Sequence, residues 1–153
     1  MLATSSLIKK LRSKFPELTF TPGEYARWSP SERTVYYNPT EPHAMWVILH
    51  EAAHGLLEHT EYSHDIELLK LERQAWHHAS TVLAPVFGIA IDPEFIETQL
   101  DTYRDWLHAK STCPTCHSNG IESAAGHYQC LHCAGSWRVN KGINTAIRRY
   151  AAS

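Results

Sequence analysis

The spacing of hydrophobic residues predicts a short helix and then several strands at the start of the chain. Leu7, Ile8 and Leu11 recur at helical spacing after Ser5 and Ser6, which are good N-caps, so the first helix should run to about Lys14. Three stretches of β-branched and aromatic residues follow, LTFTPG, YARWS and RTVYYN, with turn residues between them. They predict a small antiparallel sheet.

Three further helices are predicted by apolar residues at intervals of three and four. Residues 42–59 are apolar over most of the helix circumference and have no breaker except Gly55, so this helix should be largely buried. The next should begin near Ser63 and end before Pro85, and the last should begin with Pro93 at its first position. Helices together with a small sheet make the fold class α+β.

Composition and charge divide the chain into two parts. The chain is 43% hydrophobic and 20% charged, as expected of a folded globular protein. Residues 1–109 carry 9 Lys and Arg against 15 Asp and Glu, whereas residues 110–153 carry 5 against 1 and contain all 4 cysteines. We therefore expect one domain over residues 1–109 and a second module over residues 110–153.

The sequence has no run of about 18 apolar residues, and its N-terminus does not resemble a signal peptide. The protein is therefore expected to be cytoplasmic and to make no contact with a membrane. In a reducing compartment, cysteines in Cys-x-x-Cys pairs favour a metal site over disulfides.

The predicted buried helix contains the motif His50-Glu51-Ala52-Ala53-His54. Two imidazoles four residues apart share one face of a helix and can bind the same metal ion. Glu51 would then lie beside the metal, where its carboxylate can accept a proton from water and pass it to a leaving amine. Because unsatisfied polar groups are costly in an apolar helix, a bound metal would also explain why these residues are there. The motif predicts peptide hydrolysis with zinc as cofactor.

A catalytic zinc ion needs a third protein ligand. Glu72 on the next predicted helix is the preferred residue, because a carboxylate about two turns into that helix could reach back to the first one. The competing ligands are Glu67, His64, His59, His77 and His78.

The C-terminal module has the spacing of a structural zinc site. Its four thiolates come from Cys113, Cys116, Cys130 and Cys133, in two pairs that are separated by a stretch of turn residues. Two such knuckles can surround one tetrahedral zinc ion, and the metal supplies the stability that so small a module lacks. A zinc ribbon is therefore predicted. Its basic and aromatic residues, Arg138, Lys141, Arg148, Arg149, Trp137 and Tyr150, could contact DNA through phosphates and stacking, or equally a protein substrate.

HEAAHGLLEH followed by LERQAWHHASTVL resembles the ImmA/IrrE family of zinc metallopeptidases, which have His-Glu-x-x-His and then Glu-x-x-Ala on the following helix. RTVYYNP resembles the family's strand before the active helix, so the similarity covers about residues 20–90. The resemblance implies a zincin-like fold, with His50, His54 and Glu72 as zinc ligands and Glu51 as the base. The chain departs from the family at Trp76, where an Asn or similar residue is usual.

By the same resemblance, residues 34–37 would lie at the cleft edge, where an extended peptide can add as a further strand. The substrate would be a protein, such as a transcriptional repressor or another regulator. Tyr36, Tyr37, His77 and His78 are the candidates for stabilising the oxyanion.

Two other interpretations remain open. A SprT-like, DNA-associated protease also joins His-Glu-x-x-His to a terminal zinc ribbon, and GHYQCLHC resembles its second knuckle. That family, however, has a third His followed by Gly and an aromatic residue, whereas His64 here precedes Asp65-Ile66-Glu67. The other interpretation is a non-catalytic zinc-binding adaptor or regulatory protein, for which Glu51 would have no purpose.

Overall fold

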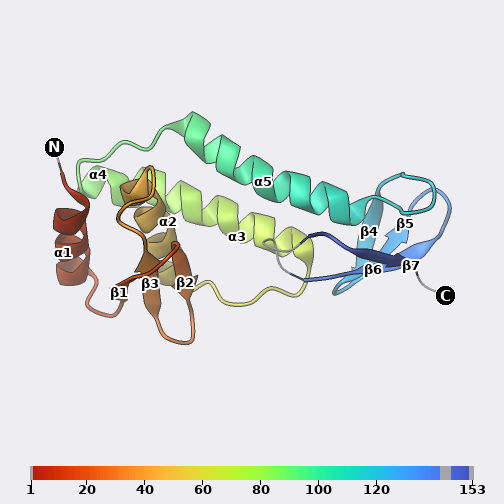
Figure 1. Cartoon of the computed structure of the whole chain (residues 1–153), viewed down its shortest axis with the longest axis horizontal. Helices are drawn as coiled ribbons and strands as arrows, with labels where there is room; N and C mark the ends of the chain where they lie inside the picture. The colour runs from red at the N-terminus through yellow and green to blue at the C-terminus, as the bar shows by residue number, and fades with distance from the viewer. Residues whose placement is uncertain (1, 142–145, 152–153) are drawn as a thin grey trace. The chain divides into compact units, whose positions relative to one another are not determined.

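The computed structural model describes residues 2–141 and 146–151, and its helices and small sheets place it in the α+β class (Figure 1). The chain forms two compact units, residues 1–60 with 71–93, and residues 61–70 with 94–153. The domain boundary expected at residue 110 stays a prediction, and residues 142–145 and 152–153 of that module lie outside the described residues. Within the described residues, no helix has both the length and the apolar character that crossing a membrane requires.

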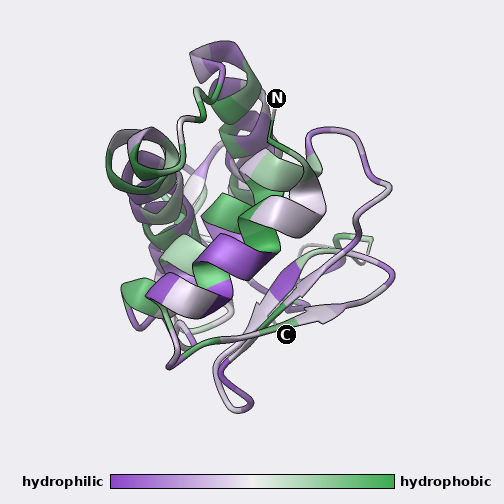
Figure 2. Cartoon of the chain, turned by 90° about the vertical axis from the view of Figure 1, so that its left-hand side faces the viewer, coloured by the Kyte–Doolittle hydropathy of each residue, from purple (hydrophilic) through white to green (hydrophobic). Residues whose placement is uncertain are grey.

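The first unit begins with helix α1, Thr4–Lys14, which buries Leu7, Ile8 and Leu11. Hydrophobic and hydrophilic residues alternate along the turns of the helices in this part of the chain (Figure 2). The predicted serine caps are wrong: the helix starts before both serines, and the extended residue Ala3 precedes it without a side-chain cap. Arg12 donates a hydrogen bond of 2.7 Å to the backbone oxygen of Phe20, which ties α1 to the first strand.

The sheet of the first unit has strands β1 (Thr19–Pro22), β2 (Arg27–Ser29) and β3 (Thr34–Tyr37), in the order β1-β3-β2. The prediction of an antiparallel sheet is wrong for one pair, since β1 runs parallel to β3 while β2 runs antiparallel to it. The strand β3 is the most buried of the three, and it pairs with β1 along one edge and with β2 along the other. Residues 34–37 therefore do not form an edge, and that expectation is also wrong.

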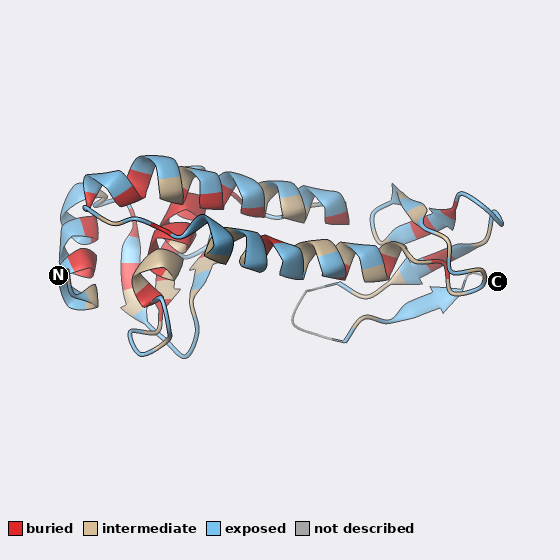
Figure 3. Ribbon diagram, turned by 90° about the horizontal axis from the view of Figure 1, so that it is seen from above, coloured by how far each residue is buried: buried red, intermediate tan, exposed pale blue. Residues whose placement is uncertain are grey.

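Helix α2, Ala44–Leu56, is the buried centre of the first unit, as predicted. It contacts β2, β3, α1 and the helical turns near residue 80. Buried residues are concentrated along it (Figure 3). His43 precedes it in the left-handed conformation, with φ 58°, and stacks on Trp46 with 4.4 Å between ring centroids.

Helix α3, Asp65–His78, contributes its first residues to the second unit and the rest to the first. It continues into the π-helical turn η1, Ala79–Leu83, and the short helix α4, Ala84–Val86. Helix α3 itself ends at His78, before Pro85 as predicted. Pro85 lies in the first turn of α4, where a missing N–H costs no helical hydrogen bond.

The second unit combines helix α5, Pro93–Ser111, with an antiparallel sheet. As predicted, α5 begins at Pro93. The sheet has the order β4-β5-β6-β7, with β4 Gly120–Ala124, β5 His127–Cys130, β6 Ser136–Val139 and β7 Arg149–Ala151. Tyr128 and Trp137 stack in its core beside the buried cysteines, with ring centroids 5.8 Å apart.

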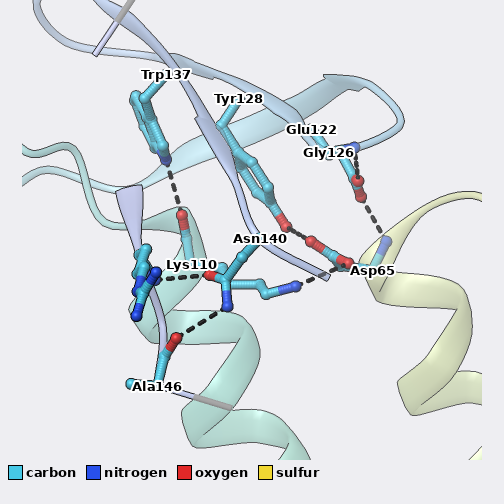
Figure 4. A network of polar contacts seen from close by, with 9 residues as sticks. Asp65, Lys110, Glu122, Gly126, Tyr128, Trp137, Asn140 and Ala146 are labelled. Atoms are coloured by element: carbon cyan, nitrogen blue, oxygen red, sulfur yellow. Dashed lines mark hydrogen bonds and ion pairs between the residues drawn. The ribbon is translucent and has the colours of Figure 1, made fainter. Parts of the chain in front are cut away.

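Asp65 is the centre of a buried polar network in the second unit (Figure 4). Tyr128 donates its hydroxyl to the Asp65 carboxylate at 2.7 Å, and the Lys110 ammonium lies 3.4 Å from the other carboxylate oxygen. The backbone N–H of Asp65 donates to Glu122. The backbone oxygen of Lys110 accepts a hydrogen bond of 2.9 Å from Trp137. These bonds connect the start of α3, the end of α5 and the sheet within one unit.

Candidate metal centres

The polar residues of α2 converge on one point inside the first unit. The Nε2 atoms of His50 and His54 lie 3.1 Å apart, as expected of imidazoles one helical turn from each other. Both side chains are buried among the apolar residues of α2. His50, Glu51 and His54 form one of the two groups of potential ligands that could hold a metal ion in the described part of the chain.

Glu72 reaches the same point from α3. One carboxylate oxygen lies 3.0 Å from Nε2 of His54, and the other lies 2.8 Å from Nε2 of His50. The second contact lacks the geometry of a hydrogen bond, so that buried oxygen has no hydrogen-bond partner in the structure. Two imidazole nitrogens and a carboxylate that converge in this way fit the ligand set of zinc. The structure thus brings together the three residues predicted as ligands.

Burial and the neighbouring charges act in opposite directions on the pKa values of this cluster. Burial lowers the pKa of His50, but the carboxylates of Glu51 and Glu72 outweigh it and raise that pKa to about 9. Burial raises the pKa of Glu72, yet its close contacts and charge interactions with the two histidines hold that pKa well below the usual range. His50 therefore holds a proton beside the ionised carboxylate of Glu72, and a metal cation could replace that proton.

Two neighbours of this cluster were not predicted from the sequence. The ring of Trp76 is buried and stacks on His50, with centroids 4.1 Å apart and an angle of 4° between the planes. The pKa of Glu41 is raised by burial and by the charge of Glu51, and one of its buried oxygens has no hydrogen-bond partner. The Trp76 ring thus packs face to face against the imidazole of His50.

The end of α2 places a third imidazole beside His54. Glu58 has a left-handed φ of 57°, and the backbone N–H groups of Glu58 and His59 donate to the oxygens of Gly55 and His54. These two bonds define a Schellman motif, which brings the residue after the left-handed one back to the last helical turn. Nδ1 of His59 consequently lies 2.9 Å from Nδ1 of His54, and Nε2 of His59 lies 3.1 Å from Oε1 of Gln74.

The other residues weighed as third ligands lie elsewhere. His64 and Glu67 belong to the second unit, are partly exposed, and contact each other and Ser63 at the start of α3. His59 faces the far nitrogen of His54. His77 is exposed at the end of α3, and burial lowers the pKa of His78. Of the oxyanion candidates, Tyr36 donates its hydroxyl to Glu32 at 2.6 Å, and Tyr37 is buried in the sheet.

The second group that could hold a metal ion comprises Cys113, Cys116, Cys130 and Cys133, whose sulfur atoms all lie within 4.8 Å of one another. Each Cys-x-x-Cys pair is followed by a residue with positive φ, His117 at 64° and Ala134 at 61°. Backbone N–H groups donate to the sulfur atoms, for example His132 to Cys130 at 3.3 Å. Such bonds stabilise thiolates, so the group fits a structural zinc ion.

Two of the basic residues predicted to contact DNA, Arg138 and Arg149, have partners within the chain. The guanidinium of Arg138 lies over the ring of Tyr150 at 5.2 Å from its centroid. Arg149 donates a hydrogen bond of 2.6 Å to the backbone oxygen of Thr112. Contact with DNA through this surface stays a prediction.

Comparison with known proteins finds no matching family model, no matching curated protein and no matching solved structure.

Proposed function

We propose that this protein is a zinc-dependent metallopeptidase of zincin-like fold that hydrolyses a peptide bond in a protein substrate. His50, His54 and Glu72 would hold the catalytic zinc ion, and the four cysteines would hold a structural one. The observation that carries the proposal is the convergence of Glu72 on both imidazoles, at 2.8 and 3.0 Å, from a separate helix.

Glu51 and Glu72 differ in burial, which supports a role as general base for Glu51 and as metal ligand for Glu72. The Glu72 side chain is 7% exposed and the Glu51 side chain is 14% exposed. A ligand gains from a dry environment, whereas a general base must reach the water molecule that it activates. Bound zinc supplies Lewis acidity, which lowers the pKa of water and polarises a carbonyl group. Glu51, 3.4 Å from Nδ1 of His50, would accept the proton of the attacking water and deliver it to the leaving amine.

Zinc content per chain, measured by elemental analysis, tests the ligands. The wild-type protein should hold two zinc ions, while His50→Ala and Glu72→Ala should each hold one. Glu67→Ala and His64→Ala remove residues of the other unit and should retain both ions. A wild-type protein with only one zinc ion, bound by the cysteines, would refute the catalytic centre.

Hydrolysis of an unfolded protein, such as casein, by the zinc-loaded protein tests the activity. Glu51→Gln should abolish cleavage while both zinc ions stay bound, and the exposed substitution Glu24→Gln should leave cleavage unchanged. If the wild-type protein holds both zinc ions but its hydrolysis is unaffected by Glu51→Gln, Glu51 is not the base. If it hydrolyses nothing, a regulatory role for the bound metal replaces the peptidase.

A further inference from the structure

The two ring nitrogens of His54 face different partners. Nε2 points to the carboxylate of Glu72 at 3.0 Å, and Nδ1 lies 2.9 Å from Nδ1 of the buried His59. The far nitrogen of His59 lies 3.1 Å from the side-chain oxygen of Gln74. Three side chains thus form one continuous chain of contacts that ends at the proposed metal position.

The number of protons on each side chain determines which atom donates in each hydrogen bond of that chain. An amide oxygen can only accept, so Nε2 of His59 must donate to Gln74. A neutral imidazole carries a single proton, so a His59 ring that donates through Nε2 keeps a lone pair at Nδ1. Nδ1 of His54 must then donate to His59, and Nε2 of a neutral His54 is left with a lone pair.

That lone pair would face a carboxylate oxygen, which also carries only lone pairs. Such a contact at 3.0 Å is repulsive unless a cation lies between the two atoms. We propose that His59 and Gln74 act as a hydrogen-bond relay, which holds His54 as the tautomer whose Nε2 can bind a metal ion. If the Gln74 amide were reversed, each proton would shift by one position, and Nε2 of His54 would carry a proton that competes with the metal.

The fold holds this relay in place from both sides. The Schellman motif fixes the backbone of His59, and Trp28 donates a hydrogen bond of 3.0 Å to the His59 backbone oxygen. A Cβ atom at Gly55 would lie only 2.9 Å from the Trp28 ring, so α2 packs closely on β2 at this point. His59 and Gln74 are positioning residues, because they act on the metal only through His54.

Zinc affinity of the full chain, with the cysteine site already loaded, tests the relay by competition with a chelator at one pH. His59→Phe keeps a ring in the pocket but removes both nitrogens, and Gln74→Met removes the acceptor at a surface position. Each should weaken zinc binding about 10- to 100-fold, the usual effect of losing an outer hydrogen-bond partner. Gln74→Glu restores an acceptor and should bind zinc at least as tightly as the wild type, while Arg73→Ala, an exposed neighbour on α3, should change nothing.

The tautomers themselves provide a readout that a purely structural role would not affect. Long-range ¹H–¹⁵N spectra of the zinc-loaded protein should show His54 protonated at Nδ1 and His59 protonated at Nε2. Protonation of His59 at Nδ1, or unchanged zinc affinity in both His59→Phe and Gln74→Met, would overturn the relay.

The inference rests on the proposed metal centre and not on peptidase activity. Zinc affinity that depends on the relay, in a protein that hydrolyses nothing, would support the relay and refute the peptidase. Hydrolysis that requires Glu51, with a zinc affinity that does not depend on His59 and Gln74, would support the peptidase and refute the relay. A wild-type protein without the second zinc ion would refute both.

Discussion

The buried ion pair of Asp65 and Lys110 should be the most sensitive electrostatic contact in the second unit. Lys110 is fully buried and Asp65 is 4% exposed, so water does not screen either charge. Asp65→Asn keeps the size of the side chain and an acceptor for the Tyr128 hydroxyl, but it leaves the Lys110 ammonium without its counter-charge. We expect this substitution to lower the free energy of unfolding by about 3 kcal/mol.

The magnitude follows from the surroundings of the ammonium group. Removing one partner of a buried ion pair typically costs about 3–5 kcal/mol. The Lys110 ammonium also lies 4.2 Å from the centroid of the Trp106 ring, and the ring face offers a partial partner after the carboxylate is gone. The expected loss is therefore at the lower end of that range.

Denaturant unfolding of the zinc-saturated protein measures this loss, with an exposed ion pair as the control. Glu97 lies 2.9 Å from Arg104 at the surface, so Glu97→Gln should cost less than about 1 kcal/mol. In the double variant Asp65→Asn, Lys110→Met no charge is left unpaired, so the loss should be about 2 kcal/mol smaller than the sum of the single losses. Additive losses, or equal losses for Asp65→Asn and Glu97→Gln, would show that the buried pair is not energetically coupled.

Four further predictions concern both units. Burial, followed by the hydrogen bond to Asp65, raises the pKa of Tyr128 above its ordinary value of 10.0. The neutral hydroxyl therefore stabilises the fold below pH 10, and this stabilisation is lost as the pH rises towards the higher pKa of the folded protein. In pH titrations of unfolding, the wild type should therefore lose stability more steeply in this range than Tyr128→Phe. Glu58→Gly should raise the free energy of unfolding by about 0.5 kcal/mol, because glycine adopts the left-handed conformation without strain; a loss in urea unfolding would contradict this. Gly120→Ala should destabilise the second unit by about 1–3 kcal/mol, because its Cβ would lie 2.7 Å from the Trp137 ring, and a shift of the thermal midpoint to lower temperature would show it. Removing zinc from the cysteines with a chelator should unfold the sheet of the second unit, seen as loss of Trp137 near-ultraviolet dichroism; an unchanged spectrum would show that the sheet folds without metal.

The sequence predicted the features that depend on neighbouring residues. Helix α2 and the start of α5 at Pro93 follow from apolar spacing and from the proline itself. The pairing of β1 with β3 could not be predicted in this way, because strand order depends on which strand the rest of the unit buries. Residues 34–37 form the central strand, with β1 paired to one edge and β2 to the other.

The same distinction applies to the site. His50 and His54 share a face of one helix, so their spacing in the sequence is enough to predict that they lie close together. Glu72 comes from another helix, and spacing alone left it in competition with His64 and Glu67. The position of His59 depends on a Schellman motif with Glu58 in the left-handed position, where glycine would have signalled the helix end. No sequence signal therefore marked His59 as the partner of His54.

Charge balance gives a reason for a divalent cation in the first unit that is independent of any resemblance. The carboxylates of Glu51 and Glu72 bring two negative charges to a nearly dry cluster. A proton on His50, whose pKa is raised to about 9, offsets only one of them. Zinc with two neutral imidazoles offsets both, and it removes the repulsion between the unprotonated nitrogen of His54 and the carboxylate of Glu72. Because an uncompensated buried charge is costly, bound zinc should stabilise the first unit.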